Sequence, residues 1–133
     1  MKIESNKVTV NASVDEVFNF LSNAENIEIL LPKAEVKEFK GSNDECSFKV
    51  QGGITISLLQ SELIPNKKIS MKSGEKSPFP FTLDIIMNDQ DGDTEGYISF
   101  EGDVNPFLKM MVKNPLTNLF NHMSNSLSEH FSK

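Results

Sequence analysis

The sequence contains no arginine and no tryptophan, and it has only one cysteine and two histidines. Arginine is the usual bidentate partner of phosphates and carboxylates, so its absence argues against a phosphate clamp. The net charge of -6 argues against a nucleic-acid partner, because phosphate backbones are bound by clustered basic side chains. Cys46 alone cannot form an internal disulfide or a cysteine-rich metal site.

Long hydrophobic runs are also missing. The first ten residues, MKIESNKVTV, lack the apolar core of a signal peptide, and no segment has the length needed for a transmembrane helix. We therefore expect a cytoplasmic protein. A chain of 133 residues has the size of one domain, so we expect residues 1–133 to form a single domain with one hydrophobic core.

The N-terminal part predicts one strand followed by two short helices. Residues 2–10 alternate between apolar and polar side chains, as a strand does. The next segment, SVDEVFNFLSNAENIEILLP, opens with Ser13 and Glu16 at the spacing of a capping box. Apolar residues then recur at helical spacing, and a second helical piece ends at Pro32.

Residues 34–104 predict six further strands, because runs of strand length alternate with clusters of turn residues. Short connections between successive strands imply an antiparallel meander. Together with residues 2–10, these runs predict a seven-stranded sheet. The six runs are 34–40, 45–51, 54–64, 67–73, 80–88 and 94–104.

Alternation within these runs predicts one sheet face that is almost wholly apolar. Gln60 and Glu62 continue the inward phase of their strand near its end, where a rim position or a bulge is equally consistent with the pattern. The apolar face comprises Cys46, Phe48, Val50, Ile54, Ile56, Leu58, Ile69, Met71, Phe81, Leu83, Ile85, Met87, Ile98, Phe100 and Val104.

Residues 105–131, NPFLKMMVKNPLTNLFNHMSNSLSEHF, predict a long C-terminal helix. At about 100° per residue, the apolar side chains before Pro115 centre on a direction roughly 150° from those after it. Proline removes a helical hydrogen bond and disfavours helix at the preceding residue. We therefore expect a change of course near Asn114, with residues 106–113 turning a different apolar face inward near one end of the sheet.

This order of elements resembles the helix-grip fold of the START-like, or Bet v 1-like, superfamily, including its SRPBCC and polyketide cyclase-like groups. The resemblance rests on SVDEVFNFLSNAENIEILLP and the terminal helix and covers residues 1–133. It implies an α+β fold in which a seven-stranded curved antiparallel sheet wraps around a long kinked C-terminal helix, with two short helices between strands 1 and 2. Such folds often enclose an apolar cavity for lipids, sterols or polyketides.

The leading functional hypothesis is a non-enzymatic binder or carrier of a hydrophobic small molecule, lipid-like or polyketide-like, held between the sheet and the C-terminal helix. We expect no catalytic constellation, cofactor or metal, and a monomer or weak homodimer. The residues expected to line the cavity are Phe48, Ile56, Leu58, Met71, Phe79, Phe81, Leu83, Ile85, Phe100, Phe107, Met110, Met111, Leu119 and Met123.

Two alternatives stay open. A cyclase or aromatase-like enzyme would need a polar group inside the cavity, and the candidates are Gln60, Glu62 and His130. A protein-interaction module would use the acidic surface or the segment that carries Lys109 and Lys113.

Several other features have a structural explanation. The acidic stretch DQDGDTE, residues 89–95, does not match a calcium loop and predicts a solvated hairpin turn. Cys46 is expected to be a buried, inert thiol, and His122 to be exposed. In SPFPF, Phe79 either caps one end of the space between sheet and helix or makes a satellite contact.

Overall fold

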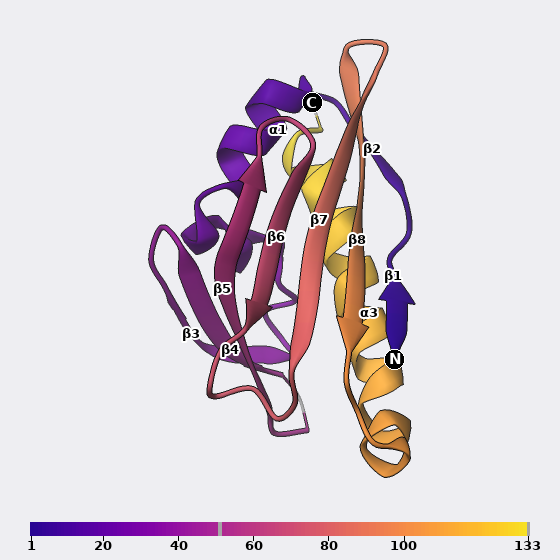
Figure 1. Ribbon diagram of the computed structural model, residues 1–133. Helices are drawn as coiled ribbons and strands as arrows, with labels where there is room; N and C mark the ends of the chain where they lie inside the picture. Colours follow the sequence, from indigo (N-terminus) through magenta and orange to yellow (C-terminus); the bar gives the residue numbers. More distant parts are fainter. Residues whose placement is uncertain (51, 133) are drawn as a thin grey trace.

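A computed structural model describes residues 1–50 and 52–132. It has an α+β architecture in which an antiparallel sheet carries all the helices on one face (Figure 1). The described strands are β1 (Lys2–Glu4), β2 (Val8–Val10), β3 (Val36–Gly41), β4 (Glu45–Val50), β5 (Ile54–Ile64), β6 (Lys68–Ser73), β7 (Phe81–Gln90) and β8 (Asp93–Gly102). The helices are α1 (Val14–Leu21), η1 (Ala24–Asn26), α2 (Ile27–Leu30) and α3 (Pro106–His130).

The sheet is an antiparallel meander from β3 to β8. Its order is β1-β8-β7-β6-β5-β4-β3, and β2 also pairs with β8, beyond β1. The six predicted runs agree with β3 to β8 apart from differences of a few residues at their ends. Gln51, which we placed at the end of one run, lies outside the described residues.

The prediction of seven strands was wrong by one in the part of the chain that the structure describes, because the first strand is split into β1 and β2. The break lies at Ser5, whose hydroxyl accepts a hydrogen bond from the backbone N–H of Ile98 at 2.8 Å. The next residue, Asn6, donates its backbone N–H to the side chain of Asn121 in α3. The chain thus leaves the β8 ladder to bond with the C-terminal helix.

The two short helices form where the sequence predicted them. Ser13 caps α1, and its hydroxyl accepts a hydrogen bond from the backbone N–H of Glu16 at 3.2 Å. Helix α1 buries Val17, Phe18 and Leu21 against the sheet side of the core. After η1 and α2 the chain reaches Pro32 and enters β3.

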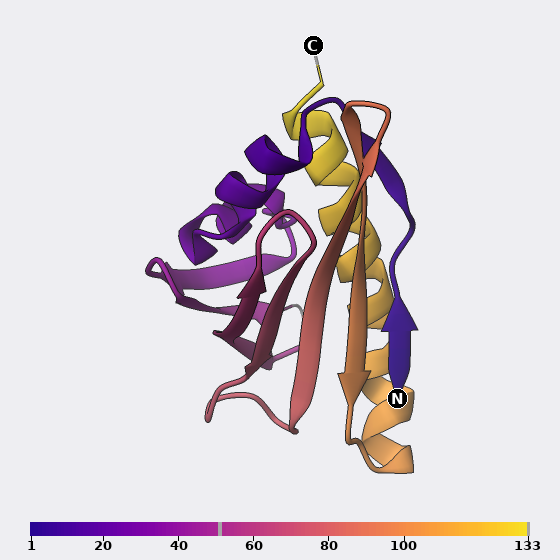
Figure 2. The same ribbon diagram turned by 45° about the horizontal axis from the view of Figure 1, so that its top comes forward.

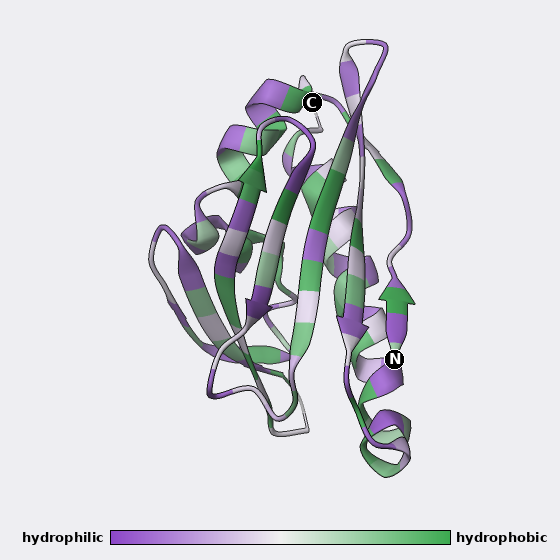
Figure 3. Ribbon diagram, in the orientation of Figure 1, coloured by the Kyte–Doolittle hydropathy of each residue, from purple (hydrophilic) through white to green (hydrophobic). Residues whose placement is uncertain are grey.

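The predicted inner face of the sheet is buried almost throughout. The alternation from β4 to β8 places apolar side chains under the helices, and only Ile54 and Val104 of the predicted set are half-buried. Green and purple segments alternate along the strands in Figure 3, as expected for a sheet with one packed face and one solvated face.

Helix α3 is continuous through Pro115, from Pro106 to His130. It lies beside β8 and the N-terminal strands β1 and β2, and its N-terminal turns extend past the end of β8 (Figures 1 and 2). One buried stripe runs from Val112 to Leu127, so the expectation that residues 106–113 turn another face inward was wrong. The members of this stripe are Val112, Leu116, Leu119, Phe120, Met123 and Leu127.

Two lysines near the start of α3 led to the wrong prediction of a second inward face. Lys109 and Lys113 project toward the same side as the later apolar stripe, at about 100° per residue. They are nevertheless exposed: Lys109 lies before Val112, the first buried residue of the helix, and Lys113 lies at the edge of the stripe. The continuous helix therefore buries neither lysine.

Candidate functional site

The interior between the sheet and α3 gathers most of the predicted cavity-lining residues in one hydrophobic core. They come from β4 to β8, from the loop before β7 and from α3, so the meander and the helix together bring them to one place. The buried members are Phe48, Ile56, Leu58, Met71, Phe79, Phe81, Leu83, Ile85, Phe100, Leu119 and Met123.

A column of aromatic rings crosses this interior. Phe100 of β8 contacts Phe81 of β7 and Phe120 of α3, with ring centroids 5.0 and 5.1 Å apart. Phe79 packs edge-on against both Phe81 and Phe100 and is only 6% exposed. Phe79 therefore belongs to the main core and closes the end of the interior beside Gly102, where a Cβ would lie 3.0 Å from its ring.

Phe107, Met110 and Met111 do not lie in this interior, which corrects their assignment to the cavity lining. Their side chains are 75%, 83% and 59% exposed. At about 100° per residue, these three positions centre on the side of α3 opposite its buried stripe. The sequence prediction took the mean direction of the apolar side chains before Pro115 as the inward face, and these three outward-facing residues determined that direction.

A surface hollow of about 360 Å³ lies beside the middle of α3, and we call it the mouth. Three segments meet there: the start of the connection after α2, the end of β4 with its turn, and the helix around Pro115. Val50 and Leu119 are core side chains that also line the hollow, so only these two buried side chains separate it from the hydrophobic interior. The mouth is lined by Pro32, Glu35, Val50, Gly52, Asn114, Pro115, Asn118 and Leu119.

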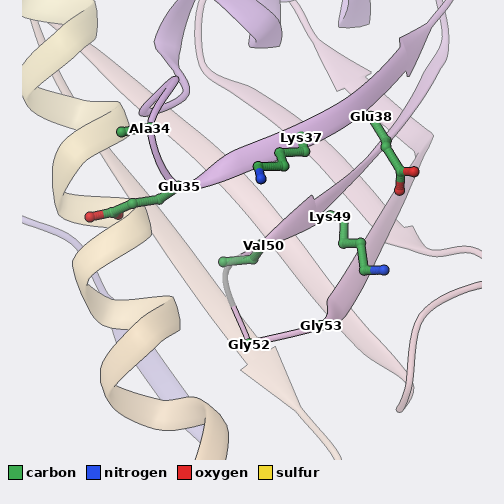
Figure 4. Close-up of a pocket in the computed structure, with 8 residues that line it drawn as sticks. All are labelled: Ala34, Glu35, Lys37, Glu38, Lys49, Val50, Gly52 and Gly53. Atoms are coloured by element: carbon green, nitrogen blue, oxygen red, sulfur yellow. The ribbon is translucent and has the colours of Figure 1, made fainter.

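A second hollow of about 420 Å³ adjoins the mouth and shares Glu35, Val50 and Gly52 with it. Figure 4 shows Glu35 extending toward α3, while Lys37 and Lys49 project from β3 and β4. The remaining lining residues are Ala34, Glu38 and Gly53. The approach to the mouth therefore carries charges of both signs.

The backbone of β3 is irregular beside this second hollow. Glu38 has a φ of 57°, in the left-handed region, and the register of β3 against β4 shifts between Lys37 and Lys40. A bulge of this kind bends a strand and interrupts its ladder, which also protects an edge strand from pairing with another chain.

The polar groups named for a cyclase-like reaction lie elsewhere. Glu62 is exposed and lies 3.8 Å from Lys68, after a register shift in β5 that confirms the bulge alternative. Gln60 donates its side-chain amide to the carbonyl of Ser22 at 2.6 Å, closing the end of α1. His130 is exposed and stacks on Phe20 with ring centroids 4.6 Å apart.

The other candidate groups have structural roles. Burial raises the pKa of the Cys46 thiol to about 12, with a smaller contribution from the negative charge of Glu45. His122 is exposed, as predicted. Asp91 and Gly92 form a two-residue turn between β7 and β8 with positive φ values of 54° and 93°, which confirms the hairpin. Within residues 1–50 and 52–132, no group of three or more His, Cys, Asp or Glu side chains could hold a metal ion.

Solved structures with the same arrangement of elements identify the fold. A START superfamily protein from Mycobacterium smegmatis superposes with a TM-score of 0.74 at 14% identity, covering 98% of this chain and 96% of that one. The chain has a START-like helix-grip fold. This fold was predicted, and the structure confirms a curved antiparallel sheet with a long C-terminal helix.

Two other solved structures with a similar fold carry different names. The protein XoxI from Bacillus cereus has a TM-score of 0.75 at 12% identity, covering 98% of this chain and 94% of that one. The Zhui aromatase/cyclase from Streptomyces sp. R1128 has a TM-score of 0.73 at 13% identity, covering 98% and 92%. No protein-family model and no curated protein matches the sequence. At identities of 12–14%, these likenesses show the fold and specify no ligand.

The mouth was only partly predictable from the sequence. Leu119 was expected in the lining, and Pro115 was recognised as a special position in the helix. Glu35 and Asn118 were missed because they are ordinary surface residues in the sequence, and only the fold brings them next to Val50.

The expectation of no membrane-spanning helix agrees with the structure: among the described residues, no helix combines the length and apolarity that crossing a bilayer requires.

Proposed function

We propose that this protein binds a hydrophobic small molecule, lipid-like or polyketide-like, between its sheet and α3, and that the molecule enters through the mouth. The observation that carries this proposal is a surface hollow in which the core side chains Val50 and Leu119 form part of the lining. The START-like fold adds support, because one structural neighbour is named as an aromatase/cyclase.

The chemistry of the interior favours an apolar ligand. The side chains that pack between β4–β8 and α3 are uncharged and largely hydrophobic, so a charged ligand would lose its hydration without gaining a partner. An apolar ligand gains about 0.8 kcal/mol for each methylene group that it buries. The length and shape of ligand that the protein accepts would depend on how far the core side chains can rearrange.

Side chains fill the middle of the interior, so a ligand needs some of them to move. Met71, Met87 and Met123 are buried in this core, and methionine can change its rotamers to fill spaces of different shapes. Met123 follows Leu119 by one turn of α3, so it is well placed to move when a molecule enters past Leu119. Binding would therefore begin at the mouth and proceed along the helix.

The rim of the mouth suits a ligand with one polar end. Asn114 and Asn118 carry amide groups at successive turns of α3, and Glu35 faces the helix across the hollow. Amides both donate and accept hydrogen bonds, so they can hold a hydroxyl or carbonyl group. An amphiphilic molecule would bury its apolar body past Val50 and leave its polar end at these side chains.

A dye titration tests this entry route. Nile red should bind the wild-type protein saturably, with a rise in fluorescence as it leaves water. The variant Asn118→Trp places a large ring at the rim and should lower the affinity by roughly tenfold or more, since 1.4 kcal/mol of lost contact corresponds to a factor of ten.

The matched control is Asn125→Trp, which lies on an exposed part of the same helix and should bind the dye like the wild type. Equal affinity in all three proteins would argue against entry at the mouth. Absence of saturable binding in the wild type, together with a ligand-free mass in native mass spectrometry after expression, would argue against the proposed function itself.

A further inference from the structure

Three large apolar side chains stand exposed together near the start of α3. We call Phe107, Met110 and Met111 the α3 patch; they are 75%, 83% and 59% exposed. They lie on one side of the helix, opposite the buried stripe, so they contribute nothing to the core. Exposed apolar residues that cluster in this way mark interaction sites more often than isolated ones do.

The patch is carried by a projecting end of the molecule. The first turns of α3 extend beyond β8, and green segments mark their hydrophobic positions in Figure 3. A planar surface could therefore reach the patch before it met the sheet. Asn105 caps this helix end by accepting a hydrogen bond from the backbone N–H of Leu108 at 2.9 Å, so the projecting turn is held as helix.

The charges around the patch differ from those of the whole chain. Residues 105–114 contain Lys109 and Lys113 and no acidic residue, whereas the complete chain has a net charge of -6. Both lysines are exposed on the side of the helix away from the patch. A lysine in this position can extend its ammonium group to lipid headgroups while the apolar side of the helix enters the membrane surface.

A second copy of this chain fits the patch less well than a membrane does. A standard protein interface uses about 20 to 30 residues on each side, far more than three side chains on a projecting helix end. A lipid surface needs only a few apolar anchors and basic side chains near the headgroups.

We propose that residues 106–113 dock the protein on membranes that contain anionic phospholipids, with Phe107, Met110 and Met111 inserted at the interface and Lys109 and Lys113 at the headgroups. This proposal does not depend on ligand binding in the interior. It has a consequence for the mouth, because Asn114 and Pro115 follow the docking segment directly. Docking would bring the mouth close to the lipid surface.

Single-tryptophan variants test the proposal, since the sequence contains no tryptophan. Phe107→Trp places a fluorescent reporter in the α3 patch. Leu63→Trp is the control, because Leu63 is also exposed, at 43%, and lies toward the β5–β6 hairpin at the other end of the sheet. Both are mixed with vesicles of phosphatidylcholine alone or of phosphatidylcholine with phosphatidylglycerol.

We expect the emission of Phe107→Trp to shift to shorter wavelength with the anionic vesicles, and that of Leu63→Trp to stay unchanged. Met110→Ser with Met111→Ser should reduce vesicle binding roughly tenfold or more, because each buried apolar side chain contributes on this scale. Lys109→Gln and Lys113→Gln should each reduce it about fivefold at low salt. Thermal unfolding of these exposed variants should match the wild type.

Equal shifts at both tryptophans, or no shift with anionic vesicles, would overturn the proposal. A concentration-dependent dimer in light scattering that is lost in the Met110→Ser, Met111→Ser variant, without vesicle binding by the wild type, would assign the patch to a second copy instead. Nile red binding by the same proteins is measured without vesicles. A protein that binds Nile red but not vesicles would contradict membrane docking alone and leave the proposed ligand binding intact.

Discussion

The hydroxyl oxygens of Ser5 and Ser124 lie 2.7 Å apart, although 119 residues separate them in the sequence. Both side chains are buried, and the Ser5 hydroxyl also accepts the backbone N–H of Ile98. This contact joins the N-terminal segment, β8 and α3 at one point. It lies in a row of polar contacts in which Asn121 and Ser128 of α3 bind the backbone of Asn6 and Thr9.

Removing either serine should destabilise the protein, and Ser5 should matter more. Ser5→Ala leaves the buried N–H of Ile98 without its partner, which should cost about 1 to 3 kcal/mol in the free energy of unfolding. Ser124→Ala should cost about 1 kcal/mol, because Ser5 keeps its bond from Ile98 and can still donate to the carbonyl of Asn6. Urea unfolding followed by circular dichroism measures both.

The control for helix propensity is Ser126→Ala on the same helix. If Ser5→Ala and Ser124→Ala unfold at the same urea concentration as this control, the contact has no energetic role. A double variant whose loss equals the sum of the two single losses would show that the hydroxyls are not coupled.

Pro115 should weaken α3 even though the helix continues through it. Proline cannot donate the backbone hydrogen bond that the carbonyl of Met111 would accept, and its ring crowds that carbonyl. Pro115→Ala should therefore raise the free energy of unfolding by about 1 to 3 kcal/mol. It should also slow the uptake of Nile red, because the mouth loses a position where the helix opens more easily.

Pro106 provides the matched comparison, since it stands at the first position of α3, where proline is favourable. Pro106→Ala should change neither stability nor uptake by a measurable amount. An unchanged melting temperature and unchanged uptake in Pro115→Ala would show that the proline has no part in stability or entry.

Truncation of Phe79 should destabilise the protein strongly, whereas truncation of Phe107 should have almost no effect on stability. Phe79→Ala removes a ring that packs on Phe81 and Phe100, and it should cost about 3 to 5 kcal/mol of stability. Phe107→Ala removes an exposed ring and should stay within about 0.5 kcal/mol of the wild type. Comparable losses of stability for the two variants in chemical denaturation would contradict the difference in burial between Phe79 and Phe107.

The Cys46 thiol should make stability fall at alkaline pH. Its pKa is raised to about 12 in the folded protein from an ordinary value of 9.0, because burial disfavours the thiolate. The unfolded chain therefore releases the proton first, and between pH 9 and 12 the thiol's contribution to stability falls by about 1.4 kcal/mol per pH unit.

Comparison with Cys46→Ala isolates this contribution, since lysine and tyrosine titrations are common to both proteins. The variant should show a shallower loss of stability above pH 9. Iodoacetamide should label wild-type Cys46 slowly when folded and rapidly in urea. Rapid labelling of the folded protein, or parallel pH profiles for the two proteins, would mean that the thiol is accessible.

The strands of the meander could be predicted because each physical signal was local. Two-residue alternation identifies which side chains face inward, and turn clusters such as Asp91 and Gly92 mark where strands end. The same logic placed Phe48 and Phe100 in the interior, where both are almost fully buried. Burial of one sheet face leaves little freedom in register.

Features that depend on distant contacts could not be predicted in this way. At the break near Ser5, the chain forms hydrogen bonds with Asn121 and Ser124 of α3. No local sequence pattern predicts these contacts between the N-terminal segment and the C-terminal helix. Met110 is exposed because it lies on the side of α3 opposite the buried stripe, and only the packing of α3 in the fold decides which side of the helix is covered. Apolar character alone does not distinguish a core residue from a docking residue.

Methyl NMR tests the central claim most directly, because it locates a ligand by the residues it touches. The methyl groups of Val50, Leu119 and Met123 are observed while dodecanol is added in the absence of membranes. We predict saturable shifts at these three residues and none at Met110 and Met111. Unshifted methyls at Val50, Leu119 and Met123, or shifts confined to Met110 and Met111, would contradict ligand entry through the mouth.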